Sequence, residues 1–320
     1  MPRTLSFAIF KNRLSSEIRN YWYSRTAFKY TDRWWNENDK INQYARITEY
    51  DGDATQVFSS IDISPKEYLE TTKSVLWAIR GNTIINIVTE FESFLYSQLK
   101  RAIYISPSLL ERSGVEISAT ELSDAFTSND PKNQIAEQIV KKYIRNKSHY
   151  KMLRKIDAVI RGGILNAHED LVERWVKKTI LRNALIHNSK KINTELINAW
   201  PDIYSNAGYD IPLDDGNIVR THHTGYLLAK KIDEQFQRTI SMHTHDAMVL
   251  ARVIFLTYKD FSLGDIAKTV YGMLSIPFNK DKAESAVAYQ KRTREYIPDF
   301  IHIEKIVKDY LEGSNTSVNN

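Results

Sequence analysis

The sequence contains no cysteine and little glycine or proline. Among its 320 residues there are 11 glycines and 8 prolines, about half the usual share of each. Without cysteine the chain cannot form a disulfide scaffold, a thiol nucleophile or a cysteine-ligated zinc site. Because all-β folds need many turns, the scarcity of chain breakers disfavours them and allows long helices.

Long apolar runs are also missing. No stretch of about eighteen apolar residues occurs, so no transmembrane helix and no membrane contact are expected. The first apolar run is interrupted by Lys11 and Arg13 and lacks the cleavage pattern of a signal peptide, which favours a cytoplasmic protein. The composition is globular, with 42% hydrophobic and 26% charged residues. The net charge of +5 allows a nucleic-acid partner without requiring one.

Apolar residues recur at steps of three and four between residues 71 and 105, which predicts a long helix buried along one broad face. Its stripe consists of Ile84, Val88, Phe91, Leu95, Leu99 and Ile103. Similar patterns predict further helices over residues 118–126, 132–160, 166–188, 194–200 and 221–240. Strands and helices do not alternate along the chain. The predicted fold is therefore all-α, an up-and-down helical bundle.

Four segments are predicted from these patterns. They are an aromatic and basic N-terminal segment (1–70), the helical bundle (71–241), a C-terminal helical extension (242–312) and a disordered tail (313–320). Between Met1 and Tyr30 there are six basic residues and one acid, interleaved with tyrosine and tryptophan. Such a segment either offers RNA a stacking and phosphate-binding surface or packs its aromatic rings against the protein. Burial is the commoner role of these side chains.

One helix carries a polar constellation, Arg182-Asn183 followed by His187. At about 100° per residue, Asn183 and His187 share a face, and the long stem of Arg182 can bring its guanidinium to the same face. The opposite side, which can anchor the helix in the core, is formed by Leu181, Ala184 and Leu185. The alternative is a structural role, in which His187 caps carbonyl groups at the end of the helix.

These three groups suit cleavage of RNA. A histidine can take the proton of a 2′-hydroxyl or give one to the 5′ leaving oxygen. An arginine fork can neutralise charge on the non-bridging oxygens, and an asparagine amide can fix the imidazole or contact a phosphate. Because the 2′-hydroxyl is the nucleophile, no metal and no cofactor is expected. One helix supplies one histidine, so a homodimer with facing helices would supply both a base and an acid.

The pattern R-N-x-x-x-H, placed near the end of a helix and followed by Asn188, resembles the HEPN superfamily, and more narrowly its ribonuclease-type domains in prokaryotic toxin and defence systems. The resemblance covers about residues 70–240 and includes the acidic and aromatic stretch 90–96. It implies a helical bundle that dimerises into a composite, metal-independent ribonuclease site. Arg182 and His187 take the catalytic positions and Asn183 the adjacent polar position. It also implies a toxin or anti-phage effector, whose regulatory or neutralising partner the sequence does not identify.

Basic residues near the motif and in the run 141–155 are the candidates for holding the RNA backbone. These residues are Lys141, Lys142, Arg145, Lys147, Lys190 and Lys191. The run also contains Arg145 and His149, a pair whose spacing is one residue shorter than that of the motif. Glu90 and Glu92 could orient Arg182 across the bundle, although acids on a long helix more often face solvent.

Two other functions remain open. The chain could be an inactive HEPN-like module that binds RNA or a nucleotide or scaffolds a partner. It could also be a DNA-binding regulator, because residues 261–273 resemble the first helix of a helix-turn-helix, although no second helix is evident. The histidine pairs at 222–223 and 243–245 lack the spacing of a metal site, so none is predicted.

Overall fold

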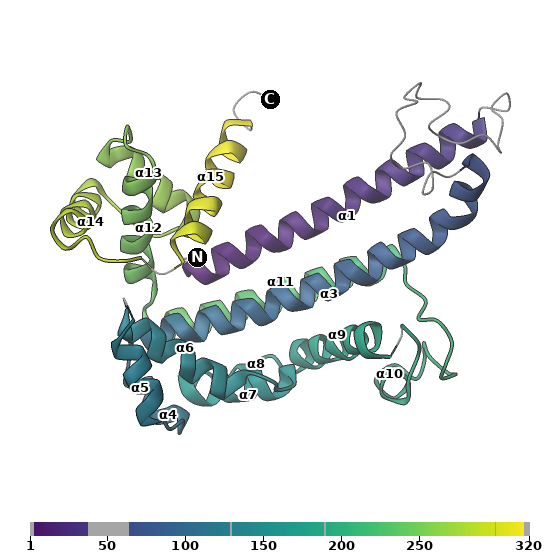
Figure 1. The fold of residues 1–320 in the computed structure, drawn as a ribbon, viewed down its shortest axis with the longest axis horizontal. Coiled ribbons are helices and arrows are strands. Elements are labelled where there is room, and N and C mark those ends of the chain that lie inside the picture. Colours follow the sequence, from purple (N-terminus) through teal and green to yellow (C-terminus); the bar gives the residue numbers. More distant parts are fainter. Residues whose placement is uncertain (1–2, 38–63, 129, 189, 298, 317–320) are drawn as a thin grey trace. The chain divides into compact units, whose positions relative to one another are not determined.

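The computed structural model describes residues 3–37, 64–128, 130–188, 190–297 and 299–316. These residues are predominantly helical, and the β-type pairing found among them is an isolated bridge between Lys191 and Asp210. The predicted all-α class is confirmed (Figure 1). In the described part of the chain, no helix combines the length and the apolar character needed to cross a membrane.

The longest helices are α1, α3 and α11, with 33, 41 and 26 residues. The helices have the following bounds: α1 Leu5–Glu37, α3 Pro65–Ile105, α4 Leu109–Ser113, α5 Ala119–Phe126, α6 Pro131–Ile144, α7 His149–Ile160, α8 Ile164–Ala167, α9 Glu169–His187, α10 Thr194–Ala199, α11 Asp215–Ile240, α12 His243–Thr257, α13 Leu263–Leu274, α14 Lys280–Thr293 and α15 Phe300–Thr316. Of the predicted disordered tail, α15 includes residues up to Thr316, and 317–320 lie outside the described residues.

The chain divides into two compact units, each assembled from segments distant in sequence. Unit 1 comprises Met1–Leu14, Val88–Thr179 and His223–Asn320, and unit 2 comprises Ser15–Ile87 and Ile180–His222. The units therefore combine segments that the sequence analysis assigned to different domains. The residues of the R-N-x-x-x-H motif belong to unit 2.

Within unit 1, helices α12 to α15 enclose a shared apolar core. Its members are fully or almost fully buried and include Leu250 and Ile254 of α12, Val270 of α13 and Val307 of α15. Leu5, the first residue of α1, belongs to the same core and is 0% exposed. The C-terminal extension is therefore joined to the N-terminal end of the chain by apolar burial.

The prediction of one helix over residues 132–160 is wrong, because α6 and α7 are separate helices. Arg145 leaves the helix in an extended conformation, and Asn146 has a φ of 58° in the left-handed region. Ser148 then starts α7 by accepting a hydrogen bond from the Lys151 N–H. Asparagine tolerates left-handed backbone, and serine is a favoured N-cap, so these residues end one helix and begin the next.

The predicted start of the motif helix at Asn166 is also wrong. Asn166 lies inside the four-residue helix α8, and α9 begins at Glu169 after His168. Ser118 and Ser262 are the N-caps of α5 and α13. Each serine forms a capping box, with Glu121 and Asp265 respectively.

The aromatic residues of α1 divide between burial and exposure. Tyr21 and Trp35 are 1% and 8% exposed, as packing against the protein requires, whereas Tyr23 and Tyr30 are 68% and 72% exposed. Tyr21 also donates a hydrogen bond to Asp215 within unit 2. The prediction of burial is therefore confirmed for some of these rings and not for others.

Gly225 of α11 lies against the ring of Trp175 on α9, and both belong to unit 1. A Cβ atom added to Gly225 would lie 2.8 Å from Trp175 Cζ3, and this ring is fully buried with its centroid 4.2 Å from that of Phe91. We expect Gly225→Ala to lower the free energy of unfolding by about 1–3 kcal/mol in denaturant titrations, because the core must shift to admit the methyl group.

Gly81→Ala is the matched control, because a Cβ there meets its neighbours at ordinary distances of 3.6 and 3.7 Å. Alanine is a better helix former than glycine by about 0.8–1.0 kcal/mol, so this variant should be as stable as the wild type or more stable. An unchanged free energy of unfolding for Gly225→Ala would contradict the packing argument.

Candidate functional site

The apolar side of the motif helix holds α9 in the core of unit 2. Leu181, Ala184 and Leu185 are 1%, 1% and 3% exposed, as the helical spacing predicted. Leu185 Cδ2 would lie 3.7 Å from a Cβ atom on Gly81, so α9 contacts α3 closely at this glycine. The C-terminal end of α9 is therefore held by burial on one side.

The polar side of the same helix carries the three predicted catalytic residues. Arg182 and Asn183 are half-buried, and the Arg182 Nη1 donates a hydrogen bond of 3.0 Å to Asn183 Oδ1. His187, the last residue of α9, is exposed. The arrangement presents an accessible imidazole and a guanidinium that is oriented by its neighbouring amide.

The turn after α9 is fixed by groups other than His187. Asn188 Nδ2 donates to the Lys191 carbonyl at 2.8 Å, and Lys190 takes a left-handed φ of 65°. Backbone hydrogen bonds then join this segment to the chain near Asp210, including Ile211 N–H to the Lys190 carbonyl at 3.2 Å. The side chain of Asn188 thus closes the turn. The alternative in which the His187 imidazole caps the helix is not needed to account for it.

Both lysines of this turn have partners within unit 2. The Lys190 ammonium lies 5.1 Å from the centroid of the Trp77 ring, and Lys191 Nζ lies 2.7 Å from Asp210 Oδ1. The Lys191 and Asp210 side chains are 44% and 73% exposed. Exposed ion pairs contribute little free energy, so a phosphate can compete for these ammonium groups.

Asp215 connects three helices of unit 2. Its carboxylate accepts hydrogen bonds from Arg80 Nη2 on α3 at 2.8 Å, from Arg25 Nε on α1 at 2.5 Å and from the Tyr21 hydroxyl. Partial burial alone would raise the pKa of Asp215, but the hydrogen bonds from Tyr21 and Arg80 outweigh it and lower the pKa. This cluster fixes the first residue of α11 against α1 and α3.

The other predicted RNA-binding residues belong to unit 1 and lie at the end of α6 and in the following turn. Lys141 pairs with Glu137 at 2.7 Å, and Lys142 pairs with Glu121 at 2.5 Å. Arg145 and Lys147 are also exposed, and no carboxylate of the described residues forms an ion pair with either. The run 141–147 thus places four exposed cations on one short stretch.

His149, the histidine of the shorter Arg–His pair, lies in the core and is 5% exposed. The Trp175 indole N–H donates to His149 Nδ1 at 3.1 Å, so Nε2 carries the ring proton and donates to Glu92 Oε1 at 2.6 Å. Glu92 is therefore engaged by His149, and Glu90 by Arg13 at 3.3 Å. Both acids therefore contact residues other than Arg182, the partner that the sequence suggested for them.

Sequence reasoning missed a cavity in unit 1 whose lining includes the cationic and titratable side chains of Arg101, Lys132 and His245. Its residues come from α3, α6, α12, α14 and the segment after α14, so no local motif identifies it. The sequence feature that could have indicated this cavity is the pair of cations Lys100 and Arg101 beside the apolar stripe of α3. Among the described residues, no group of three histidine or acidic side chains is placed to hold a metal ion.

The chain was compared with known proteins at three levels. No family model, no curated protein and no solved structure matches it. The candidate function therefore depends on the residues and their geometry.

Proposed function

We propose that the protein is a metal-independent endoribonuclease whose catalytic residues are Arg182 and His187, assisted by Asn183. The observation that carries the proposal is the exposed His187 imidazole at the end of α9, on a helix whose preceding turn holds the Arg182 guanidinium against Asn183. Imidazole and guanidinium supply the proton transfer and the charge neutralisation that cleavage next to a 2′-hydroxyl requires.

In the proposed reaction, a neutral His187 removes the proton of the 2′-hydroxyl, whose oxygen attacks the adjacent phosphorus. The bond between phosphorus and the 5′ oxygen breaks, and this oxygen takes a proton from an imidazolium. The Arg182 guanidinium stabilises the charge on the non-bridging oxygens. The products are a 2′,3′-cyclic phosphate and a 5′-hydroxyl.

Two histidines serve this chemistry better than one, because one acts as base while the other acts as acid. Each α9 supplies one His187 at the motif, so we propose a homodimer in which two copies of this helix end face one RNA strand. Lys190 and Lys191 follow the motif directly and can bind the phosphates that flank the cleaved bond. Lys141, Lys142, Arg145 and Lys147 offer further exposed positive charge in unit 1.

The resemblance to ribonuclease-type HEPN domains supports a wider proposal, that the protein acts as a toxin or an anti-phage effector. Cleavage of cellular RNA would harm the host, so such an enzyme needs restraint by a partner or a trigger. This role rests on the resemblance, whereas the chemistry rests on the site.

The test compares an RNA oligonucleotide with the DNA oligonucleotide of the same sequence, both incubated with the full chain in EDTA. We expect the RNA to be cut into products that end in a 2′,3′-cyclic phosphate and the DNA to remain intact, because DNA lacks the nucleophile. Binding of RNA without products would favour the inactive HEPN-like module. Equal cutting of DNA would exclude the proposed mechanism.

One observation favours a second candidate, a DNA-binding role for the C-terminal helices. The helix α14 packs against α13 through Ala283, Ala286 and Val287, while its cations Lys280, Lys282, Lys291 and Arg292 are exposed. Such a helix can contact a DNA backbone or groove. Under this candidate, a duplex DNA is shifted in a native gel by the wild-type chain and by an Arg182→Ala/His187→Ala variant alike.

A further inference from the structure

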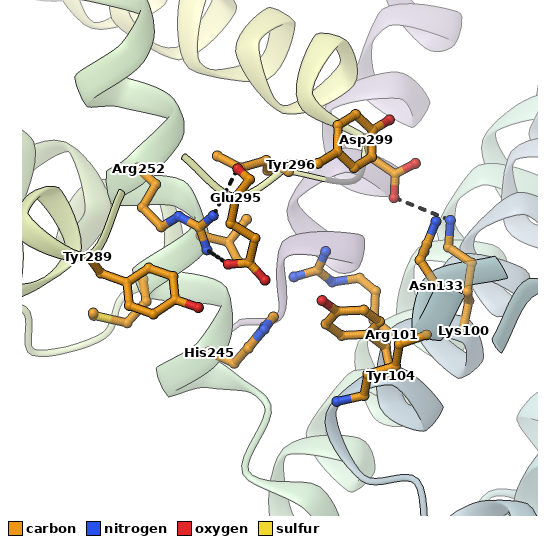
Figure 2. Close-up of a pocket in the computed structure, with 14 residues that line it drawn as sticks. Lys100, Arg101, Tyr104, Asn133, His245, Arg252, Tyr289, Glu295, Tyr296 and Asp299 are labelled. Atoms are coloured by element: carbon orange, nitrogen blue, oxygen red, sulfur yellow. Dashed lines mark hydrogen bonds and ion pairs between the residues drawn. The ribbon is translucent and has the colours of Figure 1, made fainter. Parts of the chain in front are cut away.

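Unit 1 contains a cavity of about 360 Å³ that the proposed ribonuclease site does not use. Figure 2 shows its side chains converging from separate elements, with Arg101 and Tyr104 of α3 facing His245 and Arg252 of α12. The volume lies in the range of small-molecule sites and suits one compact ligand rather than a polymer. All the residues that line it belong to unit 1.

The lining is rich in positive charge. Four cations, Lys100, Arg101, Lys132 and Arg252, line the cavity together with two carboxylates. Arg252 pairs with Glu295 at 3.1 Å, and Lys100 pairs with Asp299 at 3.5 Å. These two pairs use both lining carboxylates. The other two cations, Arg101 and Lys132, are not paired with a carboxylate that lines the cavity.

Lys132 is one of these two cations. Its ammonium lies 4.6 Å from the centroid of the Tyr104 ring, and no carboxylate in the described chain is within ion-pair distance of it. The side chain is exposed, so it can swing between the tyrosine and a ligand. Lys132 therefore provides an exposed positive charge at the edge of the cavity.

Arg101 is the other cation, and it is buried. Its side chain is 9% exposed and pairs through Nη2 with Asp246, which is fully buried. Its Nε–H lacks a hydrogen-bond partner, and so does the buried Nδ1 of His245. In Figure 2 the Arg101 guanidinium points toward the middle of the cavity. A buried donor without a partner is costly, and an anionic oxygen would satisfy it.

Aromatic side chains supply the remaining surface. Tyr289 and Tyr296 line the cavity and are 38% and 57% exposed, and Met248, Val249 and Ile297 add apolar contacts. Tyrosine rings stack on flat heterocycles and tolerate any base. The cavity thus combines a cationic end with an aromatic and apolar side.

We propose that this cavity binds a nucleoside monophosphate, with the phosphate held by Arg101 and Lys132 and the base stacked on Tyr296. A phosphate oxygen matches the Arg101 Nε–H that lacks a partner and the Lys132 ammonium, and a base matches the exposed Tyr296 ring. The inference concerns residues of unit 1 and does not depend on the ribonuclease proposal.

The experiment measures binding of AMP, adenosine and inorganic phosphate to the full chain by titration calorimetry. We expect AMP to bind. Adenosine and phosphate should each bind with an affinity lower by roughly tenfold or more, because each lacks one of the two contacts. Binding of adenosine as tight as that of AMP would overturn the phosphate assignment. No heat of binding with AMP at millimolar concentration would overturn the whole proposal.

Variants assign the binding to this cavity. Lys132→Gln should weaken AMP binding by roughly tenfold through loss of a phosphate contact, and Tyr296→Ala should weaken AMP binding while leaving phosphate binding unchanged. Both side chains are exposed, so neither change is expected to unfold the chain. Lys268→Gln, an exposed lysine of α13 outside the cavity, is the matched control and should bind AMP as the wild type does. Unchanged AMP binding in both Lys132→Gln and Tyr296→Ala would place the ligand elsewhere.

Discussion

Replacing His187 with alanine is expected to reduce the rate of RNA cleavage by about 10²–10⁴-fold, the usual contribution of a positioned proton-transfer group. The side chain is exposed at the last residue of α9, so its removal creates no cavity and the free energy of unfolding should not change. The rate is measured with a labelled RNA in EDTA, at enzyme concentrations that exceed the RNA.

His223→Ala is the matched control for this variant. His223 is also an exposed histidine on a helix, α11, but it belongs to unit 1 and is not part of the motif. It should cleave RNA at the wild-type rate. Cleavage by His187→Ala at the rate of His223→Ala would remove the His187 imidazole from the mechanism.

The same assay with Arg182→Lys distinguishes the effect of the positive charge at this position from the effect of the guanidinium geometry. Arg182→Lys keeps the positive charge but cannot present a planar fork to two phosphate oxygens. The bond from Arg182 Nη1 to Asn183 Oδ1 also depends on the guanidinium. If the guanidinium acts as proposed, the lysine variant loses most of the cleavage rate, although it still binds RNA.

Helix positions could be predicted from the sequence where one face is buried. The apolar stripe of α3 is a clear example, because Ile84, Val88, Phe91, Leu95 and Leu99 are each 0% exposed. Burial on one side of a helix imposes the three- and four-residue period that the sequence shows. The break between α6 and α7 could not be predicted in this way, because Asn146 and Ser148 interrupt the helix without disturbing the apolar pattern on either side.

The two candidate sites also differ in how far the sequence alone could predict them. Arg182, Asn183 and His187 lie within one helix, so their spacing alone indicates a shared polar side, and the structure agrees in burying Leu181 and Leu185 opposite them. The nucleotide cavity joins residues almost two hundred positions apart, from Lys100 to Asp299. Only tertiary packing brings such residues together, and no periodicity in the sequence records it.

His149 shows how packing decides between similar motifs. Its spacing from Arg145 resembles that of the proposed catalytic pair, yet both ring nitrogens are engaged in the core, by Trp175 and by Glu92. His187 ends its helix at the surface instead. Exposure, which the sequence alone does not state, separates a structural histidine from a candidate catalytic one.

The buried carboxyl group of Asp233 should make the stability of unit 1 depend on pH. Asp233 is 2% exposed, and burial raises its pKa to about 7, with the negative charge of Asp246 adding to the effect. The Thr4 hydroxyl lies 2.5 Å from Asp233 Oδ1 and 2.9 Å from Gln98 Oε1. This hydroxyl has one proton, so both contacts are satisfied when a protonated Asp233 donates to Thr4 and Thr4 donates to Gln98.

The sign of the effect follows from the proton balance. Between the unfolded pKa of 3.8 and the folded pKa of about 7, the folded state holds a proton that the unfolded state has lost. The free energy of unfolding therefore falls as pH rises through this range, by about 1.4 kcal/mol per pH unit and by no more than about 4 kcal/mol in total.

Asparagine does not ionise. Asp233→Asn should therefore gain about 2–3 kcal/mol relative to the wild type between pH 5 and pH 8, measured by denaturant unfolding. Asp260→Asn, at an exposed carboxyl group, is the control for charge removal alone. The same difference between Asp233→Asn and the wild type at pH 5 and at pH 8 would contradict a folded pKa of about 7 for this carboxyl group.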